Sequence, residues 1–179
     1  MESSTAGFRV RKARKGDAEM LSALAEKTFR VAFGGDTPGD DLESYIRENF
    51  NEKRQTLEIE NPKSAIFIAL KRNQLVGYAM LHPRDAPSCI RHKPAIELKR
   101  IYVLPDVKGT GVADSLMQAA LSEAVSRAYI LVWLSCWEIN ARAISFYRHW
   151  KFETVGNQEF IIGRDIQHDI IFQRELKEF

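Results

Sequence analysis

Residues 95–125 read AIELKRIYVLPDVKGTGVADSLMQAALSEAV, and this stretch decides the fold. It begins with a strand-like segment that ends at Val103, passes through a turn containing Gly109 and Gly111, and ends in apolar residues spaced like one face of a helix. A strand, a loop and a helix in this order direct unpaired backbone N–H groups and the positive end of the helix dipole at one place, so the stretch predicts an anion site. The apolar stripe of the helix consists of Val112, Ala113, Leu116, Met117, Ala120, Leu121, Ala124 and Val125.

The loop itself supports two interpretations. Lys108 adds positive charge at its rim, and Gly109 and Gly111 let the backbone approach a phosphate closely. A dinucleotide-binding loop would require a third glycine where Asp114 stands, and a Walker loop would end in Gly-Lys-Ser/Thr, so neither common nucleotide fingerprint is present. The alternative is that the two glycines only form a tight turn between a strand and a helix.

The apolar phase of the strand-like segment slips by one residue near residues 99–100. Ile96 and Leu98 stand at even positions, whereas Ile101 and Val103 stand at odd ones. A strand that packs on one core cannot change faces without an extra residue, so we predict a β-bulge or a kink there. Bulges are common beside active sites.

The rest of the chain also alternates between strand-like and helical segments. The order βααβββαβαββ predicts an α/β (α+β) fold, a mixed twisted sheet of about seven strands with about four helices. We expect a single domain over residues 1–179, with 1–7 as a flexible tail. The expected segments are a strand at 8–14, helices at 20–33 and 42–50 with a loose continuation toward 61, a hairpin of 64–71 and 75–82, a loop at 83–94, a buried strand at 129–134, a helix at 140–150 and closing strands at 152–162 and 168–176.

Composition excludes several classes of protein. The chain has 179 residues, 45% of them apolar, and a formal net charge of +2. The apolar fraction is too high for a disordered chain, and no apolar run approaches the ~20 residues of a membrane span. The N-terminal residues lack the basic and apolar regions of a secretory signal, so we expect a cytoplasmic protein. The low net charge gives no reason to expect a nucleic-acid partner.

The two cysteines, Cys89 and Cys136, stand far apart without a CxxC pairing. They therefore support neither a disulfide framework nor a structural zinc site, and we expect no metal.

A second informative segment, residues 137–152, reads WEINARAISFYRHWKF. Asn140, Ile144 and Tyr147 are spaced i, i+4, i+7 and share one face of a short helix. Taken alone, this pattern has a plainer explanation, because Asn140 could be only a helix cap and the aromatic residues only core packing.

Together, the two segments resemble the GNAT superfamily of N-acetyltransferases over nearly the whole chain. The family's glycine loop, Q/R-x-x-G-x-G/A, is matched by residues 108–113 with Lys108 at the first position. Its second motif is matched by Asn140, Ala143, Phe146, Tyr147 and Phe152, with Lys151 where the family has glycine. Within the family, residues 137–152, 97–103 and 28–33 are most similar to PaiA-type polyamine (spermidine/spermine) acetyltransferases.

The resemblance implies acetyl-CoA as co-substrate and a set of binding residues. Asn140 would hydrogen-bond the pantetheine arm, and Tyr147 would be the general acid for the CoA sulfur, since a phenol of reference pKa ~10 keeps its proton at neutral pH. The pyrophosphate would bind the backbone of Lys108, Gly109, Thr110, Gly111, Val112 and Ala113, and pantetheine would pair with Ile101, Tyr102 and Val103 where the strands part at the bulge.

The resemblance also implies a base and an acceptor site. An alkylamine is mostly protonated near pH 7, so a carboxylate helps to remove its proton, and Glu97 is the candidate by family analogy. The alternatives are that Glu97 is a solvated strand residue or that His82 or His92 serves instead. Acceptor-binding candidates are Phe29, Phe33, Asp40 and Asp41, with Glu43 nearby. These acids could equally be first-turn residues that complement a helix dipole.

The implied function is transfer of an acetyl group from acetyl-CoA to a primary amine, such as a polyamine, by direct attack in a ternary complex. Acetylation of a peptide, protein or other small amine, and a non-catalytic CoA-binding module, remain alternatives. The expected partner is a small-molecule amine, with no nucleic acid and no membrane, and a homodimer is left open. The sequence does not name the acceptor.

Overall fold

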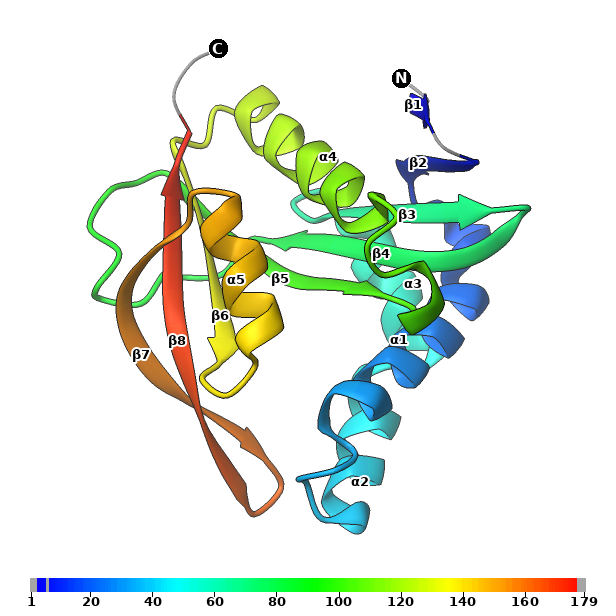
Figure 1. The fold of residues 1–179 in the computed structure, drawn as a ribbon, viewed down its shortest axis with the longest axis horizontal. Coiled ribbons are helices and arrows are strands. Elements are labelled where there is room, and N and C mark those ends of the chain that lie inside the picture. The colour runs from blue at the N-terminus through cyan, green and yellow to red at the C-terminus, as the bar shows by residue number, and fades with distance from the viewer. Residues whose placement is uncertain (1–2, 6, 177–179) are drawn as a thin grey trace.

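The computed structural model describes residues 3–5 and 7–176, and over these residues its centre is an eight-stranded sheet (Figure 1). The strand order is β1-β2-β3-β4-β5-β6-β8-β7, and all neighbours are antiparallel except the parallel pair β5 and β6. The predicted mixed α/β fold is confirmed. The strands are β1 (Ser3–Thr5), β2 (Phe8–Lys12), β3 (Ala65–Lys71), β4 (Gln74–His82), β5 (Ala95–Val103), β6 (Leu131–Trp137), β7 (Glu153–Ile162) and β8 (Asp165–Glu175).

Helices cover both faces of the sheet. One face carries α1 (Ala18–Phe33), α2 (Gly39–Asn49) and α3 (Glu52–Glu60), and the other carries α4 (Val112–Ser126) and α5 (Ala141–His149). Short 3-10 turns, η1 (Lys15–Asp17) and η2 (Pro105–Val107), precede α1 and the glycine loop. Among the described residues, no helix is both long and apolar enough to cross a membrane.

Residues 52–60 differ from the prediction, which extended the second helix loosely toward residue 61. The chain breaks at Asn51, whose backbone is extended and whose side chain accepts a hydrogen bond from the Arg54 N–H at 2.9 Å. This contact is an N-cap, and it starts a separate helix, α3. The described chain therefore has five α-helices rather than about four.

The predicted tail over residues 1–7 is described only in part. Ser3–Thr5 form β1, which pairs with β2 in a register that places Ser3 opposite Val10. Met1, Glu2 and Ala6 lie outside the described residues.

Most other predicted boundaries are close to the observed ones. The turn of the β3–β4 hairpin has positive φ at Arg72 (49°) and Asn73 (64°), the conformation that suits a two-residue hairpin loop. The last strand begins at Asp165, three residues earlier than expected. Lys151, which replaces a family glycine, itself takes the left-handed conformation after α5, with φ 63°.

The bulge predicted from the phase slip is present in β5. Met80 of β4 pairs with Arg100, and Leu81 pairs with Leu98, so Lys99 is the extra residue. The parallel pairing of β5 with β6 covers only residues 95–97 and ends where Glu97 lies opposite Trp133. Beyond that pair the two strands part, and the β6-facing edge of residues 101–103 has no partner strand in the described chain.

Candidate active site

The glycine loop joins η2 to α4 beside the parted strands. Gly109 (φ +79°) and Gly111 (φ +85°) have left-handed backbones, and no atom lies within 4 Å of the place that a Cβ would take at either position. Val107 and Val112, which are buried on either side, anchor the loop in the core. The loop thus combines a fixed backbone with open space in front of it.

The loop also has the free donors that an anion requires. The N–H groups of Lys108 and Thr110 donate to the carbonyl oxygens of Pro105 and Val107 in η2, at 3.2 and 3.3 Å. Those of Gly109 and Gly111, and those of the first turn of α4, have no backbone acceptor in the described chain. Residues 108–113 therefore fit the predicted phosphate site, with the exposed Lys108 at its rim.

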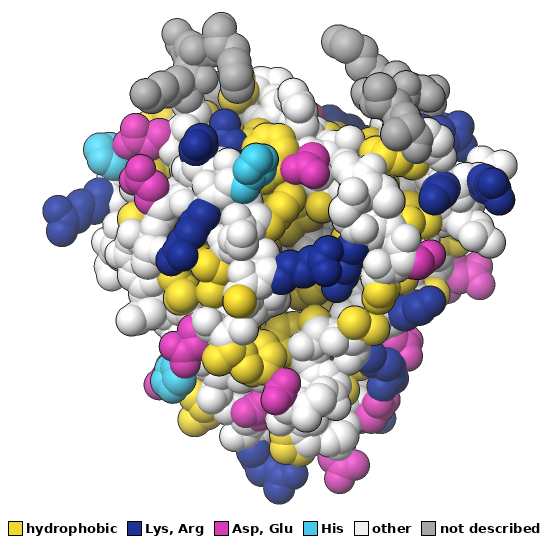
Figure 2. All heavy atoms as spheres, viewed as in Figure 1, with side chains coloured by type: hydrophobic (Ala, Val, Ile, Leu, Met, Phe, Trp, Pro, Cys, Tyr) yellow, Lys and Arg dark blue, Asp and Glu magenta, His cyan; other side chains and the backbone are white. Residues whose placement is uncertain are grey.

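The surface is hollowed between α4 and α5, and apolar side chains lie at the base of the hollow (Figure 2). Under it run the unpaired edge of residues 101–103 and the end of β6. An extended ligand with amide groups can hydrogen-bond to such an edge as an added strand does. The predicted pantetheine site at residues 101–103 has this geometry.

Asn140 is the N-cap of α5, as the plainer explanation held. Its side-chain oxygen accepts a hydrogen bond from the Ala143 N–H at 3.1 Å. The residue is exposed, so its amide NH₂ group remains available as a donor. Asn140 can therefore cap the helix and donate one hydrogen bond to a ligand at the same time.

Tyr147 points into the core from α5. Its side chain is buried, and its ring contacts Phe146, Phe152 and Phe172 with centroids about 6 Å away (5.8, 6.1 and 6.0 Å). Burial raises the pKa of the phenol well above its usual value, and the charges of Cys136 and Asp169 raise it further. The hydroxyl therefore keeps its proton at neutral pH, which a proton donor to a thiolate requires.

The family model described as "Acetyltransferase (GNAT) family" matches residues 26–152, which include the bulge, the glycine loop and Tyr147. The chain belongs to the GNAT family of acetyltransferases. Members of this family take the acetyl group from acetyl-CoA, so the expectation of an acetyl-CoA-dependent acetyltransferase is confirmed.

Relatives of this GNAT acetyltransferase agree with the assignment. An uncharacterized N-acetyltransferase of Mycobacterium tuberculosis (strain H37Rv) is 32% identical over 160 residues, which cover 89% of this chain and 98% of that protein. Streptothricin acetyltransferase of Streptomyces lavendulae is 27% identical over 163 residues, 83% of each chain. The PaiA N-acetyltransferase of Thermoplasma acidophilum, solved in complex with coenzyme A, has the same fold with a TM-score of 0.78 and 20% identity, over 96% of this chain and 100% of that one.

Glu97 is not a solvated strand residue, because its side chain is buried. One carboxylate oxygen lies 3.5 Å from an Arg84 nitrogen, and the other, Oε2, has no hydrogen-bond partner in the described chain. Burial raises the pKa of this carboxyl, and the positive charges of Arg84 and Lys99 offset only part of the effect. By strand alternation Glu97 faces away from α4, so it and Tyr147 reach the parted strands from opposite faces.

The two histidines named as alternative bases lie at the end of β4 and in the loop before β5. His82 pairs with Glu97 across β4 and β5, and its Nδ1 lies 3.5 Å from the Ser64 hydroxyl. Burial lowers the pKa of His82, so its ring is neutral at physiological pH. His92 is exposed in the loop before β5.

Phe29 and Phe33 lie in a buried aromatic cluster at the α1–α2 side of the parted strands. Phe29 stacks on Tyr45 with ring centroids 4.9 Å apart, and Phe33 stacks on Trp137 at 5.7 Å. Tyr45 and Trp137 are partly exposed, as is Phe160. The predicted residues Phe29 and Phe33 thus pack behind the partly exposed rings of Tyr45, Trp137 and Phe160, which together form an aromatic wall. The sequence analysis did not single out these three rings.

The predicted acidic cluster is not assembled as a cation site. Asp41 accepts hydrogen bonds from the backbone N–H and the Nε of Arg164, both at 3.3 Å, because the β7–β8 turn packs against the start of α2. Glu43 is paired with Arg30. Asp40 is exposed on the first turn of α2. Two of these three acids therefore serve contacts within the protein.

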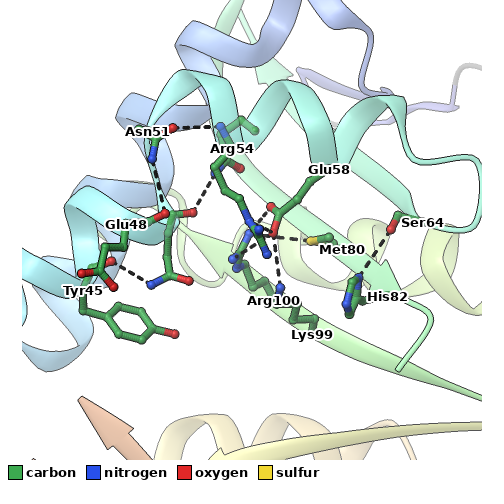
Figure 3. Close-up of polar contacts among 12 residues, drawn as sticks. Tyr45, Glu48, Asn51, Arg54, Glu58, Ser64, Met80, His82, Lys99 and Arg100 are labelled. Carbon is green, nitrogen blue, oxygen red and sulfur yellow. Dashed lines mark hydrogen bonds and ion pairs between the residues drawn. The ribbon is translucent and has the colours of Figure 1, made fainter. Parts of the chain in front are cut away.

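Glu58 on α3 is the centre of a buried ion cluster that the sequence did not predict (Figure 3). Its carboxylate lies 2.6 Å from Arg100 and 3.3 Å from both Lys99 and Arg54. Adjacent strand residues normally point to opposite faces, but the bulge at Lys99 lets Lys99 and Arg100 reach the same acid. Burial would raise the pKa of Glu58, but the positive charges of Arg100 and Lys99 outweigh it and hold the pKa below its usual value.

Asp169 on β8 is the second buried acid that sequence reasoning missed. It lies opposite Trp137 of β6, on the part of that strand that has separated from β5. In the sequence it is one polar residue in an alternating strand, and no local signal distinguishes it from a solvated one. Only the pairing of β6 with β8 brings it to the site.

Proposed function

We propose that this GNAT acetyltransferase transfers the acetyl group of acetyl-CoA to the primary amine of a small molecule, such as a polyamine, within a ternary complex. The observation that carries the proposal is the parting of β5 and β6 after Glu97, directly beside the glycine loop. The parted strands give a thioester access to the sheet from two faces. An acceptor on one face can then attack a thioester held on the other.

The binding residues follow from the loop and strand geometry. The backbone of residues 108–113 holds the pyrophosphate, and residues 101–103 pair with pantetheine as an added strand would. Asn140 donates a hydrogen bond from its amide to the pantetheine arm. The apolar hollow between α4 and α5 accommodates the intervening methylene groups.

Two protons must move during the transfer. Both leave the nitrogen of an acceptor that arrives as an ammonium group. Glu97 takes up the first, directly or through water, before the attack. The second leaves as the amide forms and restores the proton that Tyr147 gives to the departing thiolate. Burial favours both roles, because it raises the pKa of Glu97 above its usual value and keeps the Tyr147 phenol protonated.

The acceptor class depends on the side chains around the parted strands. The aromatic wall of Tyr45, Trp137 and Phe160 favours an alkylammonium group over an anionic substrate. Streptothricin acetyltransferase, to which this chain is similar, is named for a small-molecule acceptor. Of the acids named as acceptor-binding candidates, Asp41 and Glu43 are already paired with Arg164 and Arg30.

The test is release of free CoA thiol from acetyl-CoA in the presence of spermidine, n-butylamine or a lysine-containing peptide. We expect turnover with the small amines and a lower kcat/KM with the peptide. Preference for the peptide would point to protein acetylation. Binding of acetyl-CoA by calorimetry without turnover on any amine would indicate a CoA-binding module instead.

A further inference from the structure

Four carboxylates are buried among the described residues, and three of them have a cationic partner. The exception is Asp169, which receives a hydrogen bond from the Ser135 hydroxyl and has no Lys, Arg or His partner in the described chain. The three partnered acids are Asp17 with Arg11 at 2.7 Å, Glu58 with Arg100 at 2.6 Å and Glu97 with Arg84 at 3.5 Å.

A buried carboxylate without a counter-charge is unfavourable, because it loses its hydration and gains only one neutral hydrogen bond. Burial accordingly raises the pKa of Asp169, and the hydrogen bond from Ser135 offsets only part of that rise. A cation that entered the site would restore the missing charge interaction. At the other three buried acids the protein itself supplies an arginine. Asp169 has no such partner in the described chain, which indicates that its cation is part of a bound ligand.

Asp169 lies where the acceptor must arrive. It pairs with Trp137 across β6 and β8, and paired residues of an antiparallel ladder point to the same face. Trp137 stacks on Phe33, so this is the face covered by α1 and α2 rather than by α4 and α5. The site therefore lies across the sheet from α5, which carries Tyr147, and on the open part of β6.

Aromatic rings complete a site for a positive charge. Tyr45 is close enough that the charge of Asp169 contributes to its raised pKa, behind the larger effect of burial. The Phe160 ring lies 5.8 Å from that of Tyr45, and both rings are partly exposed, like that of Trp137. A carboxylate beside aromatic faces attracts an alkylammonium group through both its charge and the ring quadrupoles.

We propose that Asp169 binds the ammonium group of the acceptor and so restricts the acceptors to alkylamines that arrive as cations. This rests on the proposed acetyl transfer to an amine, which it narrows by excluding neutral aryl amines and hydroxyl compounds of the same size. Asp169 is on this view a specificity-determining residue. Glu97 lies opposite Trp133, four residues along β6 from the Trp137 that Asp169 faces, so it takes up the first proton of the bound ammonium group through water.

The test is Asp169→Asn, which removes the charge but keeps an oxygen that can accept the Ser135 hydrogen bond. We expect KM for spermidine and n-butylamine to rise about 10- to 100-fold, as loss of one partner of a buried charge pair does, with kcat within about threefold. Acetyl-CoA affinity should not change. The matched control is Glu159→Gln, which removes an exposed carboxylate from the neighbouring strand β7 and should leave KM unchanged.

Thermal unfolding gives a second readout that does not depend on turnover. Neutralising an unpaired buried charge relieves a cost, so Asp169→Asn should melt at the same temperature as the parent or higher. Spermidine should raise the melting temperature of the parent, n-butanol should not, and the variant should respond to neither. If the parent acetylates no amine, the proposed function fails, while this protection experiment still tests Asp169.

Three results would overturn the inference. One is an unchanged KM in Asp169→Asn together with full protection by spermidine. Another is a fall in kcat at constant KM, which would make Asp169 a base rather than a binding group. The third is a variant that melts lower or does not fold, because the carboxylate would then have a structural partner.

Discussion

The Tyr147 phenol is the single group on which the proposed departure of CoA depends. Tyr147→Phe keeps the ring contacts with Phe146, Phe152 and Phe172 and removes only the proton. Because general acid catalysis contributes about 10²–10⁴ in rate, turnover should fall within that range while acetyl-CoA affinity stays constant. Single-turnover rates and calorimetry measure the two quantities. A variant with the parent's chemical rate would make Tyr147 a core aromatic only.

At Glu97 the test is a pH profile. The carboxyl must be ionised to accept a proton, and its pKa is raised by burial, so kcat/KM should fall on the acid side at a higher pH than an ordinary glutamate would give. Arg84 lowers the pKa of Glu97, so Arg84→Gln should move this limb to still higher pH. Glu97→Gln should abolish the limb and slow turnover about 10²–10⁴-fold. A limb that persists in Glu97→Gln would assign the titration to another group.

Gly111 tests the phosphate site. Space for a side chain exists there, but the φ of +85° disfavours most residues and the anion approaches the same backbone. Gly111→Asn and Gly111→Asp have nearly the same shape, and asparagine tolerates left-handed backbone, so the pair separates charge from conformation. Calorimetry should show a loss of acetyl-CoA affinity at least about tenfold greater for Asp than for Asn, since the carboxylate repels the phosphates. Equal affinities would move the pyrophosphate elsewhere.

At the scale of elements, the ion pairs of Glu58 with Lys99 and Arg100 hold α3 against the β5 bulge. Glu58→Gln leaves the buried Arg100 without its counter-charge, and breaking such pairs costs about 3–5 kcal/mol of unfolding free energy. Because the pKa of Glu58 is lower in the folded state, the ionised pair contributes fully above the ordinary glutamate range, and its contribution is lost as pH falls below it. Urea unfolding at pH 7 and at pH 4 measures both effects.

The matched control for Glu58 is Glu60→Gln on the same helix, where the exposed acid pairs with Lys15. Glu60→Gln should change the free energy of unfolding by no more than about 0.5 kcal/mol. A loss as small for Glu58→Gln would mean that packing, rather than the ion cluster, holds α3 on the sheet.

Elements whose signal is local could be predicted from the sequence. The phase slip located the bulge at Lys99, and the glycines located the loop before α4, because each depends on a few adjacent residues. α3 was missed because it depends on the cap at Asn51 in a polar stretch. Glu58 and Asp169 were missed for a different reason: their roles exist only where a distant segment packs on β5 or pairs with β6.

For the molecule as a whole, the net positive charge weakly repels the proposed cationic acceptor. The formal net charge is +2, and basic and acidic side chains are interspersed on the face shown in Figure 2. Such a surface does not draw a polycation in from a distance. Recognition of an amine must therefore come from groups at the site, where a buried pair is screened little by salt.

This opposition predicts an unusual salt dependence. Added salt screens the weak long-range repulsion between the protein and spermidine, but leaves the contact with the buried Asp169 nearly intact. We therefore expect kcat/KM for spermidine to stay level or rise by up to about threefold between about 20 and 300 mM NaCl. The monovalent n-butylamine should respond less, because it carries a smaller charge. A steep fall with salt for spermidine alone would instead assign recruitment to exposed acids such as Asp40, which salt screens fully.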